Sequence, residues 1–342
     1  MLWLDKHRPT RLSDLDYHLE LTDQLETLGT QKNLPHLLFY GPSGAGKKTR
    51  VLCLLREVFG ASVSSLHVDS KTFKFGGSST SVDVPIVSSN HHIELTPSEQ
   101  GKHDRHIIQE VIKEIAGSRS LDSRGKGFKV VVLNEVDHLS KSAQHALRRT
   151  MEKYMASCRL VLIATSIGKV LEPVRSRCLC IRVPAPTVAE ISSVMKSVAK
   201  AQRQQINADV IDSLANVCDR NLRRGLLALE LSHCTGSIAQ PDWVLYIEQV
   251  AGKIIADPSP RGVLAVRKML YELLVRCVPC NVVFSCLTRL LLHQVPFHLK
   301  STVLYSAAQF QHNSVRGSKD IYHLEAFVVS VMSSLKQHEF SS

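Results

Sequence analysis

Residues 36–55, HLLFYGPSGAGKKTRVLCLL, decide the fold of this chain. The apolar run at 37–40 is followed by a glycine-rich turn at 41–47 and then by apolar residues at 51, 54, 55 and 58. A buried run, such a turn and a helical period in this order predict a strand, a phosphate-binding loop and a helix. The residues of the predicted loop are Gly41, Pro42, Ser43, Gly44, Ala45, Gly46 and Lys47.

The chemistry of this loop depends on its glycines and its lysine. Glycines let backbone N–H groups turn towards phosphate oxygens, the next helix adds the positive end of its dipole, and Lys47 reaches the β- and γ-phosphates. The next residue is ordinarily a serine or threonine whose hydroxyl ligates Mg²⁺. Here it is Lys48, and Thr49 stands one position late. The loop therefore predicts a site for ATP or ADP that is poorly equipped for Mg²⁺.

Two further buried strands are predicted at 129–133 and 159–164, both as continuous apolar runs. The first of them is followed by Asn134-Glu135, where an ATPase of this kind carries Asp-Glu. The Asp normally holds Mg²⁺ and the Glu polarises the attacking water. Asn134 is a poor metal ligand, and Glu135 contributes little without a well-placed metal. Two losses on the metal side of one site favour a damaged ATPase over a variant of an active one.

Strands that alternate with helices predict a doubly wound α/β domain, which we place at residues 1–183. Its sheet is expected to be parallel, with helices on both faces. Within it, residues 61–98 are rich in Ser, Thr and His and predict an insertion or extra hairpin, with short strands at 65–68 and 92–95. The His91-His92 pair is interpreted as a strand or surface feature, because no further metal-like partner lies near it in the sequence.

The strand signals end before Pro184, and helical patterns follow. Residues 184–240 predict a small helical lid domain, and a Gly/Ser/Pro-containing linker is expected at 235–241. Long amphipathic patterns then predict a third, α-helical domain at 241–342. The helices predicted for the lid span 187–200, 209–219 and 221–233.

Composition and charge indicate the class of partner and the cell compartment. The 342 residues carry a formal net charge of +11, from 42 Lys and Arg against 31 Asp and Glu, which favours a polyanionic partner such as nucleic acid. No run approaches the roughly 18 apolar residues of a membrane span, and no secretory signal is evident, so an intracellular protein with no membrane partner is expected. Nine cysteines then fit reduced thiols. We interpret Cys277-x-x-Cys280 as buried structural thiols and expect no metal ligands in this chain.

Residues 143–152, AQHALRRTME, resemble the AQxALRRTME helix of clamp-loader small subunits of the replication factor C type. Further blocks match in family order: WLDKHRP at 3–9, SRC at 176–178 and NLR at 221–223. The GKKT form of the loop and the altered Asp-Glu pair resemble the subunit type that ends the ring with an inactive site.

The resemblance implies an α/β AAA+ fold, an α-helical lid and an α-helical C-terminal collar through which subunits join. It implies a heteropentamer that uses ATP binding and hydrolysis to open a sliding clamp and load it onto primer-template DNA. The implied partners are the other replication factor C subunits, the sliding clamp (proliferating cell nuclear antigen) and DNA, and the implied location is the nucleus. By this resemblance the subunit itself has little or no ATPase activity.

Roles for single residues follow from the same resemblance. Arg177 corresponds to an arginine finger offered to the neighbouring subunit's ATP, and Arg223 to the sensor of the lid. Thr165 stands where the family commonly has a sensor asparagine. The alternatives are an ordinary surface arginine for Arg177 and a solvated cluster for Arg223. The N-terminal segment that would close over the adenine is Lys6-His7-Arg8-Pro9.

Candidate contacts with DNA phosphates lie on two predicted helices. Backbone contacts of this kind are independent of sequence and sensitive to salt. The alternative for the second helix is an exposed basic face in which Glu152 simply pairs with Arg148 four residues earlier. The candidates are Arg105 and His106 on the first helix and Arg148 and Arg149 on the second.

An apolar edge on the 107–115 helix resembles the family's clamp-facing surface, and core packing is its alternative. It comprises Ile112, Ile115, Ala116 and Leu121.

Two other classes of function stay open. An active AAA+ ATPase of the origin-recognition or helicase-loader kind would share the loop and the lid, but it would be expected to carry an intact Asp-Glu pair. A purely structural subunit would have lost nucleotide binding. Neither explains the ordered ALRRTME and SRC blocks as well.

Overall fold

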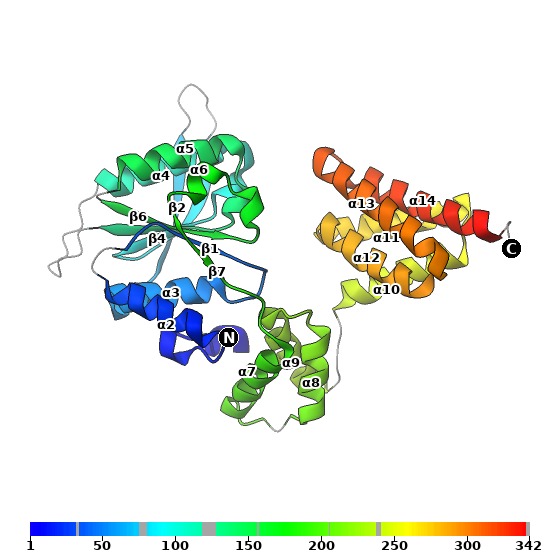
Figure 1. The fold of residues 1–342 in the computed structure, drawn as a ribbon, viewed down its shortest axis with the longest axis horizontal. Coiled ribbons are helices and arrows are strands. Elements are labelled where there is room, and N and C mark those ends of the chain that lie inside the picture. Colours follow the sequence, from blue (N-terminus) through cyan, green and yellow to red (C-terminus); the bar gives the residue numbers. More distant parts are fainter. Residues whose placement is uncertain are drawn as a thin grey trace. The chain divides into compact units, whose positions relative to one another are not determined.

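The computed structural model describes residues 1–31, 34–74, 81–117, 128–155, 157–204, 206–236 and 241–339. The chain forms two compact units, Met1–Ile238 and Ala239–Ser342. Figure 1 shows the sheet and helices α1 to α9 in the first unit and helices α10 to α14 in the second. Because the sheet and the helices of the predicted lid fall in one unit, a separate lid domain stays a prediction.

The first unit is built on a seven-stranded sheet in the order β2-β3-β4-β5-β6-β1-β7. The strands from β4 to β7 run parallel to their neighbours, whereas β2 and β3 pair antiparallel with each other and β3 with β4. The strands span Leu37–Tyr40 (β1), His67–Lys74 (β2), Ser81–Ser88 (β3), His92–Leu95 (β4), Lys129–Leu133 (β5), Cys158–Ala164 (β6) and Leu179–Arg182 (β7).

Both faces of this sheet are covered, which explains the continuous apolar runs. Leu37 and Phe39 pack into the core on one face, and Leu38 between them packs into the core on the other, as the two-residue period of a strand requires. In Figure 1, α2 and α3 lie on one side of the sheet and α4, α5 and α6 on the other. These helices span Leu19–Thr30 (α2), Lys47–Phe59 (α3), Asp104–Gly117 (α4), Lys141–Lys153 (α5) and Glu172–Arg175 (α6).

A small three-helix group follows the sheet and has an apolar core of its own. Its first helix begins with a capping box: Thr187 Oγ1 accepts from the Glu190 backbone N–H at 3.2 Å, and the Glu190 carboxylate accepts from the Thr187 N–H at 2.6 Å. Trp3 and Leu4 of the N-terminal helix α1 (Trp3–Lys6) pack against this core. The three helices span Val188–Ala201 (α7), Ala208–Val217 (α8) and Leu222–Thr235 (α9).

Helices joined by short connections make up the second unit, and its described residues contain no strand. Its helices bury one shared core, in which Phe284 and Phe327 lie with ring centroids 5.6 Å apart. Ser259 caps α11 through the Gly262 N–H, and Pro260 occupies the first helical position, where its missing N–H is tolerated. The helices span Asp242–Ala256 (α10), Pro260–Val275 (α11), Cys280–Gln294 (α12), Lys300–Arg316 (α13) and Asp320–Glu339 (α14).

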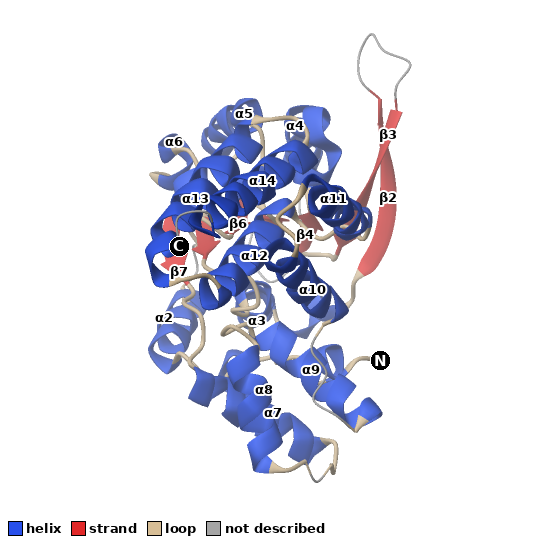
Figure 2. Cartoon of the chain, turned by 90° about the vertical axis from the view of Figure 1, so that its right-hand side faces the viewer, coloured by secondary structure: helices blue, strands red, loops and turns tan. Residues whose placement is uncertain are grey.

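The predicted insertion is in part a hairpin and in part a strand of the main sheet. Figure 2 shows β2 and β3 as a long two-stranded ribbon. The β4 strand, predicted as a piece of the insertion, instead pairs parallel with β5 in the middle of the sheet. His92 is buried there, and its Nδ1 lies 2.6 Å from the Ser89 hydroxyl.

The nine cysteines are free thiols. The interpretation of Cys277 and Cys280 as buried is wrong for Cys277, which is exposed just before α12, and Cys280 is half-buried. In the described part of the chain, no group of three or more His, Cys, Asp or Glu side chains is placed to hold a metal ion. No helix among the described residues is both long and apolar enough to span a bilayer.

Candidate nucleotide-binding site

The glycine-rich loop runs from the end of β1 to the start of α3, between the N-terminal segment and α9. Gly44 and Gly46 have φ of +76° and +84°, a region that L side chains rarely adopt. A Cβ on Gly44 would lie 1.8 Å from Asn221 Oδ1, and one on Gly46 would lie 2.3 Å from the Tyr17 hydroxyl. Both positions therefore require glycine for two reasons: the backbone conformation and the close approach of a neighbouring side chain.

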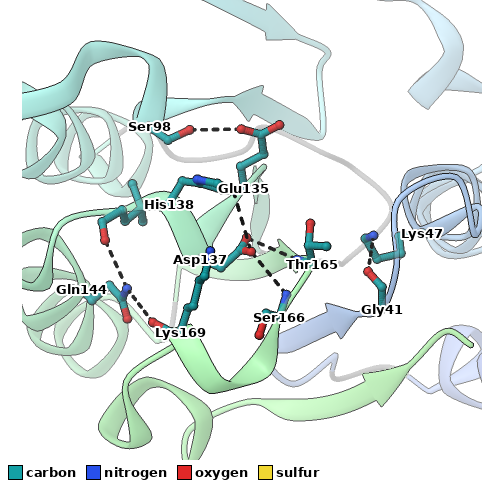
Figure 3. Close-up of polar contacts among 11 residues, drawn as sticks. Gly41, Lys47, Ser98, Glu135, Asp137, His138, Gln144, Thr165, Ser166 and Lys169 are labelled. Carbon is teal, nitrogen blue, oxygen red and sulfur yellow. Dashed lines mark hydrogen bonds and ion pairs between the residues drawn. The ribbon is translucent and has the colours of Figure 1, made fainter. Parts of the chain in front are cut away.

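Lys47 is the first residue of α3, and its ammonium donates to the Gly41 carbonyl at 2.6 Å (Figure 3). It also donates to the Pro42 carbonyl at 2.8 Å. Burial lowers the pKa of Lys47, the Asp137 carboxylate raises it, and the charge of Arg223 lowers it further. These groups come from α3, the turn Val136–His138 that follows β5, and α9. The fold thus brings the loop lysine and the predicted lid sensor into one electrostatic site.

Lys48 lies beside a carboxylate that was not singled out in the sequence. Its ammonium forms an ion pair with Glu94 of β4, whose residue is only 7% exposed. The Asn134 amide donates to the same Glu94 Oε1 at 2.8 Å and lies 3.5 Å from the Thr96 hydroxyl. The two residues that depart from the usual metal ligands therefore meet on one buried carboxylate.

The residues present do not fit a Mg²⁺ site. Mg²⁺ requires oxygen ligands in near-octahedral geometry. At this place the chain offers the Lys48 ammonium, the Asn134 amide and a carboxylate oxygen that both of them already engage. The Thr49 hydroxyl accepts from Arg8 Nε at 3.2 Å. The hydroxyl that stands one position late is therefore bound to the N-terminal segment.

Glu135 and Asp137 follow β5 but have different surroundings (Figure 3). Glu135 is exposed, with φ of +53°, and its carboxylate lies 3.5 Å from the Ser98 hydroxyl. Asp137 is buried and accepts from the backbone N–H groups of Thr165 and Ser166, both at 3.2 Å. Asp137 therefore fixes the turn that carries Thr165. Sequence reasoning missed this role, although an acidic residue four positions after the strand was a visible signal.

A cavity of about 460 Å³ lies next to the loop. One side of it is apolar, from helices α7 and α9, and the other is polar, from the loop and the N-terminal segment. Lys6 is outside its lining and donates at 3.2 Å to Oε1 of Gln202, the residue that follows α7. The size and the two-sided lining suit a nucleoside bound beside a phosphate loop. Lining residues that carry this argument are Arg8, Pro9, Lys48, Val198, Leu222 and Arg223.

Arg177 lies outside this lining and contacts the α5 helix. Its Nε donates to Glu152 Oε1 at 2.8 Å, and its Nη1 donates to the Pro173 carbonyl at 2.7 Å. Arg148 Nε is 3.7 Å from the same Glu152 oxygen. The pairing of Glu152 with Arg148 that the sequence left as an alternative is present, and Arg177 shares it.

The four candidate DNA contacts lie at two places on one face of the sheet. Arg105 and His106 are exposed in the first turn of α4, and Arg148 and Arg149 are exposed in the second half of α5. The two helices pack side by side (Figure 1). The start of α4 is tied to the start of α5 by Asp104, which accepts from the Ser140 N–H and hydroxyl at 2.7 and 3.0 Å.

The interpretation of the α4 apolar edge as a clamp-facing surface is wrong for Ile112 and Ile115. These side chains are 1% and 4% exposed and belong to the core between α4 and the sheet. The apolar stripe of an amphipathic helix faces the sheet that it covers, which explains the burial. The Ala116 side chain and Leu121 lie outside the described residues.

Comparison with solved structures identifies the fold. The RuvB Holliday junction branch migration motor of Thermotoga maritima superposes with a TM-score of 0.50 at 16% identity, over 77% of this chain and 85% of that chain. A second structure of the same motor, a point mutant, gives a TM-score of 0.51 at 15% identity over 78% and 85% of the two chains. At these identities the likeness concerns the fold alone: an AAA+ α/β fold, here followed by a helical unit.

Comparison with known sequences identifies the family. Residues 243–339 match the family described as replication factor C subunit 3, C-terminal domain, and residues 18–187 match DNA polymerase III, delta subunit. The chain is 45% identical to replication factor C subunit 5 of Schizosaccharomyces pombe over 97% of its length and 96% of that protein. It is 43% identical to replication factor C subunit 3 of Homo sapiens over 98% and 96%. The chain therefore belongs to the replication factor C family of clamp-loader small subunits, in its subunit 3/5 branch.

Proposed function

We propose that this chain works as a small subunit of the heteropentameric clamp loader, which opens the sliding clamp and loads it onto primer-template DNA. Its partners are then the other replication factor C subunits, proliferating cell nuclear antigen and DNA, and it works in the nucleus. Family membership over nearly the whole chain supports this role. The net charge of +11 supports contact with a polyanion.

Within this complex the chain binds ATP or ADP and hydrolyses it poorly. The single observation that carries this part is the contact of Lys48 and Asn134 with Glu94, where an active site would present metal ligands. The loop backbone, Lys47 and Arg223 keep the phosphate-binding half of the site. The site therefore lacks the metal ligands that hydrolysis needs, but it retains the main groups that bind the phosphates.

Arg177 supplies positive charge to a neighbouring subunit's ATP. Its guanidinium lies on the α5 surface, outside the cavity of its own chain, as a group that acts across an interface must. An arginine supplied in this way stabilises charge that develops on the transferred phosphoryl group. The chain thus contributes to ATP hydrolysis in the active site of the neighbouring subunit.

DNA contact is assigned to the exposed basic side chains on α4 and α5. Arg148 and Arg149 present two guanidinium groups on adjacent residues of one helix, and Arg105 and His106 lie on the helix beside it. Such groups bind phosphates without reading bases. This suits a complex that acts at any primer end.

The experiment that tests this function is retention of labelled ATP by the purified full chain, followed by measurement of released phosphate. We expect retention with little phosphate release, and loss of retention in Lys47→Ala. A chain that retains nothing would be the structural subunit. A chain that releases phosphate at the rate of an intact AAA+ subunit, with the activity lost in Glu135→Gln, would be the active ATPase.

A further inference from the structure

We propose that the Lys48 ammonium, held in place by Glu94, takes the place of the nucleotide's metal ion, so that this site binds nucleotide without Mg²⁺. The proposal rests on nucleotide binding by the chain. It goes beyond poor hydrolysis, because it assigns a positive role to the residue that displaced the metal ligand. It also names Glu94, from a different strand, as the residue that positions Lys48.

The sheet brings Glu94 to the phosphate loop. β4 pairs parallel with β5, in the register Glu94↔Val132 and Leu95↔Leu133, and the Asn134 N–H continues the ladder to the Leu95 carbonyl at 3.0 Å. Glu94 therefore lies level with the end of β5, where a metal-binding aspartate would stand. A carboxylate buried at this place is strongly unfavourable unless it is paired. Lys48 and Asn134 supply that pairing.

The Lys48 ammonium remains accessible from the cavity. Its side chain is 40% exposed, and the residue lines the cavity with the loop and with Arg223. An ammonium has three N–H donors, so the ion pair with Glu94 leaves two for phosphate oxygens. A lysine acts on phosphate as a point charge. It can therefore neutralise part of a diphosphate from the position that a cation would occupy.

The surrounding charges disfavour a second cation. Lys48 and Arg223 line the cavity together, the charge of Arg223 also acts on Lys47, and Glu94 is already neutralised by Lys48. The carboxylates in the same lining, Asp5, Asp14 and Asp16, all come from the N-terminal residues. The Thr49 side chain cannot replace the missing hydroxyl, because consecutive helical residues are about 100° apart around the axis and Thr49 contacts Arg8 instead. The chain thus places its own positive charge where an active subunit would recruit Mg²⁺.

The test is the affinity of the full chain for fluorescent ADP in excess Mg²⁺ and in EDTA. For the unaltered chain we expect the two dissociation constants to agree within about twofold. The double variant Lys48→Thr, Asn134→Asp restores the two side chains that ordinarily ligate Mg²⁺. We expect it to bind about tenfold or more weakly in EDTA than in Mg²⁺. Equal metal dependence in the two proteins would overturn the proposal.

The role of Glu94 is tested by Glu94→Gln, which keeps the size and removes the charge that holds Lys48. We expect affinity to fall about three- to tenfold in both buffers, from loss of a positioned charge-assisted hydrogen bond. In Lys48→Met the additional change Glu94→Gln should then have no further effect on affinity. An additive effect would show that Glu94 acts independently of Lys48.

The unaltered chain separates failure of this inference from failure of nucleotide binding. If it binds ADP in neither buffer, the proposal of nucleotide binding is wrong. If it binds ADP only in Mg²⁺, nucleotide binding is retained and the metal-free role of Lys48 is wrong.

Discussion

The Arg177 guanidinium and the Glu152 carboxylate form a two-point ion pair, with Nε and Nη2 at 2.8 and 2.5 Å from the same Oε1. Glu152 ends the AQHALRRTME stretch, and Arg177 belongs to the SRC block that follows α6. Glu152 also lies 3.7 Å from Arg148. One carboxylate therefore holds both the proposed arginine finger and a proposed DNA contact.

This arrangement predicts that Glu152 positions Arg177. Glu152→Gln removes the charge and keeps the shape. We expect the ATPase rate of the reconstituted complex to fall about two- to fivefold, because a partly exposed ion pair contributes up to about 1 kcal/mol. The matched control is Glu172→Gln on the neighbouring helix α6, which should leave the rate unchanged. An unchanged rate in Glu152→Gln, with Arg177→Ala strongly impaired, would show that Arg177 needs no such support.

The exposed arginines of α5 predict a salt-dependent DNA contact. Replacing Arg148 and Arg149 by Ala should weaken binding of primed DNA by the complex about equally across sequences. Each lost phosphate contact should lower the slope of log affinity against log salt by about one. The comparison is Lys200→Ala on helix α7, with no change expected. If affinity falls while the slope stays constant, the two arginines support the helix and do not touch phosphate.

The close approach of Asn221 to Gly44 predicts that nucleotide binding weakens strongly when a side chain is added at Gly44. In Gly44→Ala the new methyl group would meet Asn221 at 1.8 Å, and the residue would keep a φ of +76°. We expect ADP affinity to fall more than tenfold, because the loop can no longer hold this shape. Gly252→Ala in α10 is the control, since no atom lies within 4 Å of its added Cβ. In this control the free energy of unfolding, measured by thermal denaturation, should rise by up to about 1 kcal/mol, because Ala favours the helix over Gly. Normal ADP binding by Gly44→Ala would contradict the loop geometry.

A buried histidine predicts part of the pH dependence of stability. His36 precedes β1, its Nδ1 accepts from the Leu160 N–H at 3.0 Å, and burial together with Arg159 lowers its pKa below the ordinary 6.5. Below pH 6.5 the unfolded chain therefore binds a proton that the folded chain does not. The free energy of unfolding should fall as pH falls from 6.5 towards the folded pKa, by up to about 1.4 kcal/mol per pH unit for this group.

The measurement is urea unfolding between pH 5 and 7.5 for the unaltered chain and for His36→Asn, whose side-chain oxygen can still accept from Leu160. The variant should show a smaller pH slope below 6.5. His18 and His92 also have pKa values lowered by burial, so some slope remains in the variant. An identical slope in both proteins would mean that His36 does not titrate in this window.

The sequence predicts the phosphate loop and the central strands, because short runs of neighbouring residues determine them. The loop is recognisable because its glycines, its lysine and the flanking strand and helix occur together in one stretch. The β1, β5 and β6 strands are recognisable because both of their faces are buried. β4 is assigned to the insertion by its sequence because His92 and Glu94 make a four-residue strand look polar. Only its pairing with β5 shows why a buried carboxylate belongs there.

The rest of the site depends on contacts between distant residues. Lys48 and Asn134 are recognisable as departures from the usual ligands, but nothing in the sequence indicates that they meet on Glu94. The sequence offers Glu152 only as a partner of Arg148, because Arg177 is 25 positions away. The prediction of an exposed edge at Ile112 and Ile115 is wrong because periodicity gives the apolar face of a helix without saying what covers it.

The most direct measurement of the division of roles compares Lys47→Ala and Arg177→Ala in the same reconstituted complex, with clamp and primed DNA present and assembly checked by sizing. Arg177→Ala should lower the ATPase rate of the complex by up to about 10³-fold at the site that it serves, and leave nucleotide binding by this chain intact. Lys47→Ala should empty the chain's own site and change the turnover of the complex much less. If Lys47→Ala instead abolishes turnover while Arg177→Ala has no effect, this chain is an active ATPase and the roles assigned to the two residues are reversed.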